Sequence, residues 1–399
     1  MASLRVRLRC IVLLVGLLCG VQLPAVWAAE WSLVPSIGAK GVYNSNLLLT
    51  PLPHDATYGY WLSPAAEFAG KTERLTVSSR VAADFVSYYG GEETQFTNVF
   101  LPLTLSYKTD KDLLGFTGGF VRDNTLMSEL LTTGLVLRFT QRNQLTANPS
   151  WTRRISENLS FQFSGQVNDT TYENGISLGL VDYQLFGGSG GLLYQMTERD
   201  QIQLSGSYTN FRTTNAPSPF HASFPGVNLS LTHAFTETLT GTAYGGPRYV
   251  NSTNETVGGD ITAQSTVWLF GASLTKTLES TSLQANIDRD IVPSGFGFLI
   301  QRDRAGLTVS HDLTENLTAS LNGSGYLVSG ITTLASGSTF PDNRYVYCTP
   351  KIAWKFLEWW MLELSYTYGR REVDGSNSAM SNATMFTFTY FPPKLAFSN

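Results

Sequence analysis

Two acidic and two basic residues flank a predicted turn at residues 293–298 and carry the clearest chemistry in the sequence. They share the parity of the polar residues on their segments, and they are Asp288, Asp290, Arg302 and Arg304. Antiparallel pairing across the turn would bring the opposite charges together on one polar face. A wall charged in this way can orient a passing solute, as rings of charge do in pores. The alternative is that the pairs neutralise one another and only keep the wall polar.

The same parity argument predicts a second charged group on the polar face further along the chain. It consists of Lys351, Lys355 and Glu363. The same two interpretations apply to it, a filter for solutes or a self-neutralising polar wall.

The four histidines raise the alternative of hydrolysis, because an outer-membrane lipid hydrolase needs a histidine beside a serine. His233 and His311 share parity with apolar neighbours, so we expect both rings to lie at the lipid interface. His54 and His221 fall in predicted external loops beside prolines. The sequence contains no Gly-x-Ser-x-Gly elbow, metal-spaced histidine pair or phosphate-binding loop in the required context. We therefore expect no catalytic residue, no cofactor site and no metal site.

Strands with one apolar and one polar face position these residues. Residues 159–168 alternate strictly between the two kinds, and similar runs begin near Ile202, Leu239, Leu283 and Leu317. A short polar turn recurs before them, as in residues 194–198, 233–237 and 311–315. Counting looser copies gives eight such turns, 35 to 45 residues apart as a rule.

The pattern predicts an all-β fold, a transmembrane antiparallel up-and-down β-barrel. Short turns alternate with longer connections at 213–222, 251–259 and 330–342, as periplasmic turns alternate with external loops in such barrels. Aromatic residues gather near the turns, where a headgroup belt would lie, and they are Tyr107, Trp151, Tyr194, Trp354, Trp359 and Trp360.

Eight periplasmic turns imply eighteen strands, with sixteen as the fallback count. The first strand is expected near Leu33 to Leu49, and the last near Ser381 to Phe391. Residues 130–155 are interpreted as one long strand, because two strands there would break the parity of periplasmic termini. Since no loop of forty residues or N-terminal plug is evident, an unblocked lumen is expected. The loop at 213–222 could fold inward, but an external hairpin tip is the preferred interpretation.

The N-terminus has the features of a secretory signal peptide over residues 1–28, leaving 29–399 as a single barrel domain. Arg5, Arg7 and Arg9 precede an apolar run that ends before a cleavage site near Ala28. Without these arginines, the 27 basic and 31 acidic residues become 24 and 31, a formal charge of about −7. This charge makes nucleic acid a poor partner. Only Cys348 remains in the mature chain, so no internal disulfide is expected.

The chain resembles the β-barrel porin family, whose members are often encoded beside exopolysaccharide-production genes. The resemblance runs over nearly the whole mature chain. It is carried by residues 41–47 (GVYNSNL), Leu62-Ser63-Pro64, the recurring Thr-Glu turns, Tyr172 and the pair Asp182-Tyr183. It implies a barrel of the Gram-negative outer membrane that a polysaccharide or similar polymer crosses. The aromatic closing strand, residues 385–391, resembles the signal read by the barrel-assembly machinery, although residues 392–399 extend beyond it.

These features together favour a channel that is not an enzyme. Its expected partners are outer-membrane lipid, the assembly machinery during biogenesis, and either an exported exopolysaccharide or small polar solutes. Two alternatives stay open. One is a structural or surface-interaction barrel without transport, and the other is an outer-membrane hydrolase that uses His233 or His311.

Overall fold

The computed structural model describes residues 30–51, 54–133, 139–256, 258–331, 342–374 and 377–398. The predicted signal peptide lies outside these residues. The first half of the described chain contains nine long strands and two short helices: β1 (Glu30–Asn44), β2 (Thr57–Lys71), β3 (Leu75–Gly90), β4 (Thr94–Lys108), β5 (Asp112–Asn124), α2 (Thr125–Thr133), β6 (Gln141–Arg154), β7 (Leu159–Tyr172), η1 (Gly175–Leu178), β8 (Tyr183–Gln195) and β9 (Asp200–Thr213).

The second half of the described chain consists of strands alone. They are β10 (Phe220–Ser223), β11 (Gly226–Thr236), β12 (Leu239–Thr256), β13 (Gly259–Thr277), β14 (Thr281–Pro293), β15 (Leu299–Thr314), β16 (Leu317–Gly330), β17 (Asn343–Leu357), β18 (Trp360–Val373), β19 (Ala379–Tyr390) and β20 (Leu395–Ser398).

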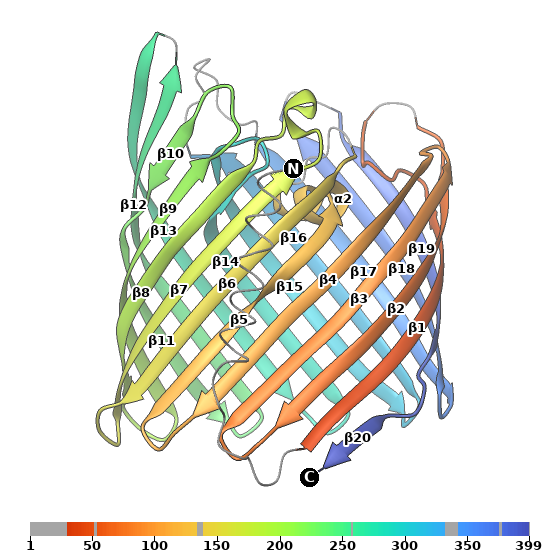
Figure 1. Cartoon of the computed structure of the whole chain (residues 1–399), viewed down its shortest axis with the longest axis horizontal. Coiled ribbons are helices and arrows are strands. Elements are labelled where there is room, and N and C mark those ends of the chain that lie inside the picture. The colour runs from red at the N-terminus through yellow and green to blue at the C-terminus, as the bar shows by residue number, and fades with distance from the viewer. Residues whose placement is uncertain are drawn as a thin grey trace.

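These strands form one closed antiparallel barrel of eighteen staves, where a stave is one long strand or two shorter strands in line (Figure 1). Each long strand pairs with its neighbours in sequence, and β1 pairs with β19 from Ile37 opposite Tyr390 to Asn44 opposite Ala383. Closure through β1 and β19 leaves no free edge along the barrel, which is what a sheet needs in lipid, where no water can satisfy a free backbone group. The predicted fold class and the count of eighteen strands are confirmed.

Two of the eighteen staves are interrupted at prolines. β10 and β11 both pair with β9 and β12, and the break between them contains Pro225. β19 and β20 both pair with β1, and the break contains Pro392 and Pro393. Proline cannot donate to the ladder, so each break falls where a strand must lose a hydrogen bond. The residues after the aromatic closing strand therefore continue the seam to Ser398.

All eight predicted short turns lie at the end of the barrel that also holds the start of β1 and the end of β20 (Figure 1). Hydrogen bonds within the turns close them tightly. For example, Thr72 donates its backbone N–H to the carbonyl of Leu75 at 2.8 Å. We call this end periplasmic and the opposite end external. The segment 251–259, predicted as a long loop, is instead strand up to Thr256 and from Gly259, and it forms a hairpin that projects beyond the other strands.

The outer face of the barrel is apolar and the inner face is polar. Large apolar side chains point outward from alternate positions, such as Phe163, Leu204, Ile287 and Leu307, each more than two-fifths exposed. Each strand has 11 residues or more apart from β10 and β20, enough for a tilted crossing of about ten residues. Five of the six predicted belt aromatics are described as outward and near periplasmic turns, and the sixth, Trp151, donates its Nε1 to Asp112 at 2.9 Å.

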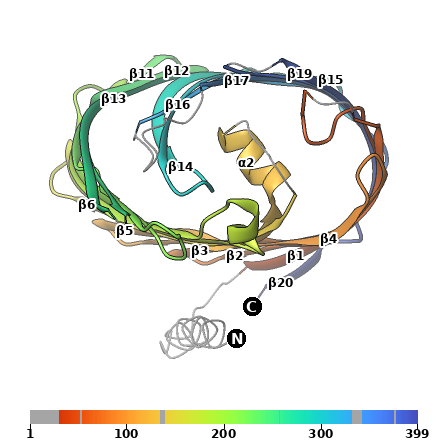
Figure 2. The ribbon, with the colours of Figure 1, turned by 90° about the horizontal axis from the view of Figure 1, so that it is seen from above.

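One prediction was wrong about the segment 130–155. Its first part is the end of helix α2, and β6 begins only at Gln141. The strand count survives because the segment still supplies a single strand. Seen along the barrel axis, α2 lies inside the ring of strands (Figure 2). Within the described residues, no helix has the length and apolarity needed to cross a membrane.

Replacing Ile287 by arginine tests the outward face. Ile287 lies midway along β14 and is half exposed, so a charge there would face hydrocarbon. We expect the free energy of unfolding in lipid vesicles to fall by about 2–4 kcal/mol. The control is Gln284→Arg on the same strand, whose side chain has the inward parity and should change stability by less than about 1 kcal/mol. Equal losses from both substitutions would contradict the assignment of faces.

Candidate functional site

The site is the lumen wall together with the segments that fold into it. β14 and β15 supply its central charges, because their register places Asp288 opposite Arg304 and Asp290 opposite Arg302. Nε of Arg304 donates to Oδ1 of Asp288 at 2.9 Å. Asn286 donates to the same oxygen at 3.1 Å. The structure thus brings together, on the inner face, the four residues that antiparallel pairing across the turn was expected to join.

Arg302 is held more loosely than Arg304. Its guanidinium lies 5.9 Å from the centre of the Tyr326 ring on β16, within the range of a cation–π contact. Its Nε is buried with no hydrogen-bond partner among the described residues. Arg248, on β12, interacts electrostatically with Asp290. The cluster therefore contains three arginines and two aspartates, so that one positive charge is in excess.

Lys351 and Glu363 form a second ion pair. Nζ of Lys351 lies 2.9 Å from Oε1 of Glu363, across β17 and β18. Lys355 lies on the same face of β17 but four residues nearer the periplasmic turn, and it is exposed. The structure joins two members of the predicted group and leaves the third at the periplasmic mouth.

A further luminal pair escaped the sequence analysis. Lys40 on β1 lies 3.5 Å from Asp84 on β3, and Ser63 on β2 donates to the same carboxylate at 2.5 Å. The ammonium of Lys40 also lies 4.8 Å from the centre of the Trp61 ring. The only available signal was parity, since each of these residues alternates with outward apolar neighbours.

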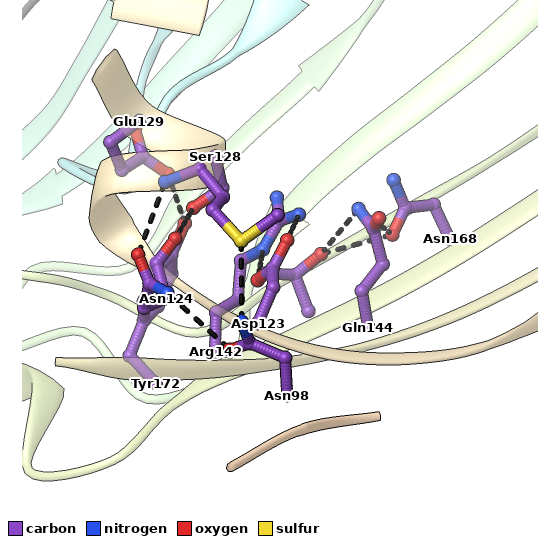
Figure 3. A network of polar contacts seen from close by, with 11 residues as sticks. Asn98, Asp123, Asn124, Ser128, Glu129, Arg142, Gln144, Asn168 and Tyr172 are labelled. Carbon is purple, nitrogen blue, oxygen red and sulfur yellow. Dashed lines mark hydrogen bonds and ion pairs between the residues drawn. The ribbon is translucent and has the colours of Figure 1, made fainter. Parts of the chain in front are cut away.

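Helix α2 was the main element that sequence analysis missed. Asn124 caps it, because its Oδ1 accepts the backbone N–H of Met127 at 3.2 Å, a common helix start. Asn124 also donates to Oδ1 of Asn98 on β4 at 3.3 Å, and Asn98 in turn donates to the sulfur of Met127 at 3.4 Å. The start of the helix is thereby fixed to the barrel wall (Figure 3). An asparagine followed by apolar residues at helical spacing was the signal that could have revealed it.

An ion pair behind α2 connects β5 and β6. Arg142 donates to both oxygens of Asp123, at 2.9 and 2.7 Å, in a fork geometry (Figure 3). Both side chains are nearly buried, at 12% and 7% exposed. Bidentate pairing of this kind is among the stronger polar contacts in proteins. It fixes the two strands from which the α2 segment departs.

Glu129 on α2 is 3% exposed and lies at a junction of three segments. Its carboxylate accepts a short hydrogen bond from the hydroxyl of Tyr172, at the end of β7. The other carboxylate oxygen accepts the backbone N–H of Gly295, in the β14–β15 loop, at 3.2 Å. Burial raises the pKa of Glu129 above the ordinary carboxyl value, although these hydrogen bonds oppose the shift.

The β14–β15 loop, residues 294–298, also folds inward. It closes on itself through the N–H of Ser294, which donates to the carbonyl of Phe298 at 3.0 Å. Gly297 has a φ of +85°, a conformation that favours glycine. The N–H of Val181, after η1, donates to the carbonyl of Gly295 at 2.7 Å. This loop therefore connects α2 to the external end of β8.

Apolar clusters line the same level of the lumen. One joins Tyr183, Phe211 and Phe220 on the wall with Phe296 of the loop. Another joins Tyr326 and Tyr345 on the wall with Leu49, Phe298 and Leu130 of α2. Phe211 and Phe220, which flank the 213–222 connection, are buried wall residues. Segments from several external connections meet inside the barrel, an arrangement that the sequence did not lead us to expect.

The motif at residues 41–47 shapes the β1–β2 connection. Asn46 is 1% exposed, and its side-chain amide donates to the carbonyls of Thr50 and Met380 at 2.9 and 3.0 Å. The N–H of Thr50 donates to Oδ1 of Asn46 at 3.1 Å. This turn places Leu49 in the luminal cluster. The φ of Leu49 is +51°. In this structure the motif positions a luminal residue.

The histidines do not assemble a nucleophilic site within the described residues. Nδ1 of His233 lies 2.6 Å from Asp200, and its ring packs edge-on against Phe235. Nδ1 of His311 lies 2.8 Å from the hydroxyl of Thr281, and His221 pairs with Glu255 at 3.2 Å. In the described part of the chain, no group of three His, Cys, Asp or Glu is close enough to hold a metal ion.

Comparisons with known proteins give similarity in structure only. No protein-family model and no curated protein matches the chain. Among solved structures, it is similar to the ferric citrate transporter FecA in the unliganded form, with a TM-score of 0.49 and 11% identity. The similarity covers 86% of this chain and 60% of the length of FecA. It is also similar to OccK5 of Pseudomonas aeruginosa (TM-score 0.45, 12% identity, 90% and 98% covered) and OccAB3 of Acinetobacter baumannii (0.44, 10%, 92% and 99%).

The closed barrel with a lipid-type exterior fixes the location of this chain. Only helices and closed barrels satisfy their backbone inside a bilayer, and barrels of this kind belong to the outer membrane of Gram-negative bacteria. The protein is an outer-membrane β-barrel. The low identities and TM-scores carry no substrate over to it.

Substitution of Arg142 by glutamine tests the ion pair behind α2. The change leaves Asp123 buried without its cation, so we expect the free energy of unfolding to fall by about 3–5 kcal/mol. Arg370→Gln, which breaks an exposed pair with Glu372, should cost less than about 1 kcal/mol. Urea unfolding in vesicles measures both. A loss for Arg142→Gln no larger than that of the control would show that the buried pair does not hold β5 and β6.

Proposed function

We propose that this protein is a porin-like channel that passes small polar solutes across the outer membrane, and that it is not an enzyme. The observation that carries the proposal is the division of every stave into an apolar outer and a polar inner face within a barrel of eighteen strands. Barrels of eight or ten strands fill their interior with side chains, whereas sixteen or more leave a lumen. A structural barrel without transport would need no such wall.

The inner wall over β7 to β9 is neutral and rich in amides and hydroxyls. Gln203 donates to Gln162 at 2.9 Å, and the hydroxyls of Ser164 and Ser189 lie 2.7 Å apart. Groups of this kind can replace the water lost by a polar solute without holding it as strongly as a full charge would. This side of the lumen suits hydroxyl- or amide-bearing solutes.

The wall over β12 to β15 carries the arginine–aspartate cluster. Because Arg248, Arg302 and Arg304 outnumber Asp288 and Asp290, the local field favours anions. Asp288 and Arg304 form an ion pair, so each offsets the charge of the other. Arg302, which stacks on Tyr326 and has no ion pair among the described contacts, is the residue best placed to filter charge.

Export of an exopolysaccharide is the second candidate. It is supported by the resemblance carried by residues 41–47, Tyr172 and Asp182-Tyr183. The segments folded into the lumen argue against free passage of a wide polymer in this conformation. We therefore place small-solute diffusion first, and polymer passage would require these segments to move.

The proposal that the protein is not a hydrolase is supported by the outer-face histidines. His233 has a carboxylate partner but no described contact with a serine hydroxyl, and His311 has a hydroxyl partner but no described carboxylate. A nucleophilic site needs both partners on one histidine. Loss of a lipid-cleaving activity on His233→Ala would overturn this part of the proposal.

Arg302→Gln tests the electrostatic filter. Removing this cation should shift the reversal potential in a potassium chloride gradient toward cation selectivity, whereas Asp290→Asn should shift it toward anions. Each change removes one charge from a cluster of five, so we expect the permeability ratio to change about two- to five-fold. Measurements on purified protein in planar bilayers give the ratio.

Arg289→Gln is the matched control. Arg289 lies beside Asp288 on β14 but points outward, where it pairs with Asp303 at 2.6 Å. Its loss should leave the permeability ratio unchanged. Equal effects of Arg289→Gln and Arg302→Gln would remove the lumen wall as the source of selectivity, and folded wild-type protein without any conductance would end the channel proposal.

Swelling of proteoliposomes separates the two candidate functions. We expect neutral monosaccharides to enter at a rate that falls by about ten-fold or more for a tetrasaccharide, because α2 and the 294–298 loop narrow the lumen. Empty liposomes provide the baseline. Equal rates for the two sugars would favour polymer passage over small-solute diffusion.

A further inference from the structure

We propose that α2 is a movable gate inside the lumen and that Glu129 is the latch that holds it closed, so that the gate opens as the pH rises. This inference rests on the proposed channel function and adds its regulation. The latch joins three elements that are far apart in sequence: α2, the end of β7 and the β14–β15 loop.

Among the described residues, two hydrogen bonds that hold α2 beyond its start meet at one carboxyl group. Its start is fixed to the wall by Asn124 and Asn98, so this end can act as the pivot. Beyond it, Glu129 meets Tyr172 and the N–H of Gly295, and Leu130 packs on the cluster of Leu49 and Ile300. Breaking these two hydrogen bonds would separate Glu129 from the end of β7 and from the β14–β15 loop.

Gly295 is the residue that allows the latch to close. A β-carbon at this position would lie 2.7 Å from the Tyr172 hydroxyl and 2.9 Å from Oε1 of Glu129. Both distances are shorter than van der Waals contact. The glycine therefore permits the helix, the strand and the loop to meet around one carboxyl group, and alanine would push them apart.

The charge state of Glu129 is decided by the groups around it. Tyr172 on β7 and Gly295 donate to it, Arg142 on β6 attracts its charge, and Asp123 on β5 repels it. Tyr183 on β8 also interacts with it, and Asp182 lies in the adjoining loop, where it accepts the N–H of Tyr172 at 2.8 Å. Burial outweighs the attractions and raises the pKa of Glu129.

The direction of the pH effect follows from that raised pKa. In the closed state the protonated form of Glu129 is favoured, whereas in the open state the carboxyl meets water and titrates near its ordinary value. Protons therefore bind more tightly to the closed state, which is fully favoured below the ordinary pKa and loses its advantage as the pH rises through the raised one. Between the two pKa values, each rise of one pH unit increases the ratio of open to closed protein about ten-fold.

The experiment measures conductance of purified full-length protein in planar bilayers between about pH 5 and about pH 8. We expect wild-type conductance to increase with pH. Glu129→Gln keeps the shape of the latch but cannot ionise, so its conductance should stay at the acidic level throughout. Gly295→Ala should conduct at the high level already at acidic pH. The control Glu173→Gln removes an exposed carboxylate paired with Arg122, and it should keep the wild-type profile.

A second readout follows the helix without any need for conduction. Ser128→Cys, with Cys348→Ser to remove the native thiol, places a nearly isosteric thiol at a position only 4% exposed. Labelling of this cysteine by a membrane-impermeant thiol reagent should become faster as the pH rises. The rate should rise more steeply with pH than in the same protein carrying Glu129→Gln. That comparison corrects for ionisation of the thiol itself. Equal slopes, or a wild-type conductance profile retained by Glu129→Gln, would overturn the gate. Absence of conductance in every variant, with labelling that still depends on Glu129, would overturn the channel and leave the moving helix.

Discussion

The constraint on which the structure depends is that a strand in a bilayer must find a hydrogen-bonding partner on both sides. The pairing of β1 with β19 meets this constraint by closing the sheet, and β20 extends the same seam beyond the prolines that interrupt it. Closure in turn fixes the two faces, because alternate side chains of a closed sheet must point either into lipid or into the lumen. Polar residues could therefore collect inside without loss of stability in the membrane.

The lumen that results is not an empty cylinder. Charged pairs occupy its wall at separate places, Asp288 with Arg304, Lys351 with Glu363 and Lys40 with Asp84. Most of the charge is neutralised where it stands, so selectivity depends on the few groups that are not. The segments that enter the lumen add apolar contacts at the external end, and this is the region in which we propose that passage is gated.

A buried carboxyl group at the junction of three segments is costly unless it contributes something beyond stability. Glu129 is such a group, since a glutamine or an apolar residue could fill the same space on α2 without the cost of burying a charge. Its position between a helix, a strand end and a loop links protonation to the geometry of the lumen. The polar wall and the proposed gate are thus separate features, one set by strand parity and the other by the connections.

Several features could be predicted from the residue order alone: the strands, the eight periplasmic turns, the closed barrel and the inward parity of Asp288, Asp290, Arg302 and Arg304. These follow from a two-residue period and from pairing between neighbours in the chain, which are local properties. The helix at residues 125–133 inside the lumen, and the contacts of Glu129 with Tyr172 and Gly295, became visible only in the folded chain. Those contacts join segments 43 and 166 residues apart in the chain, and the direction in which a connection folds depends on packing across the barrel that no local pattern encodes.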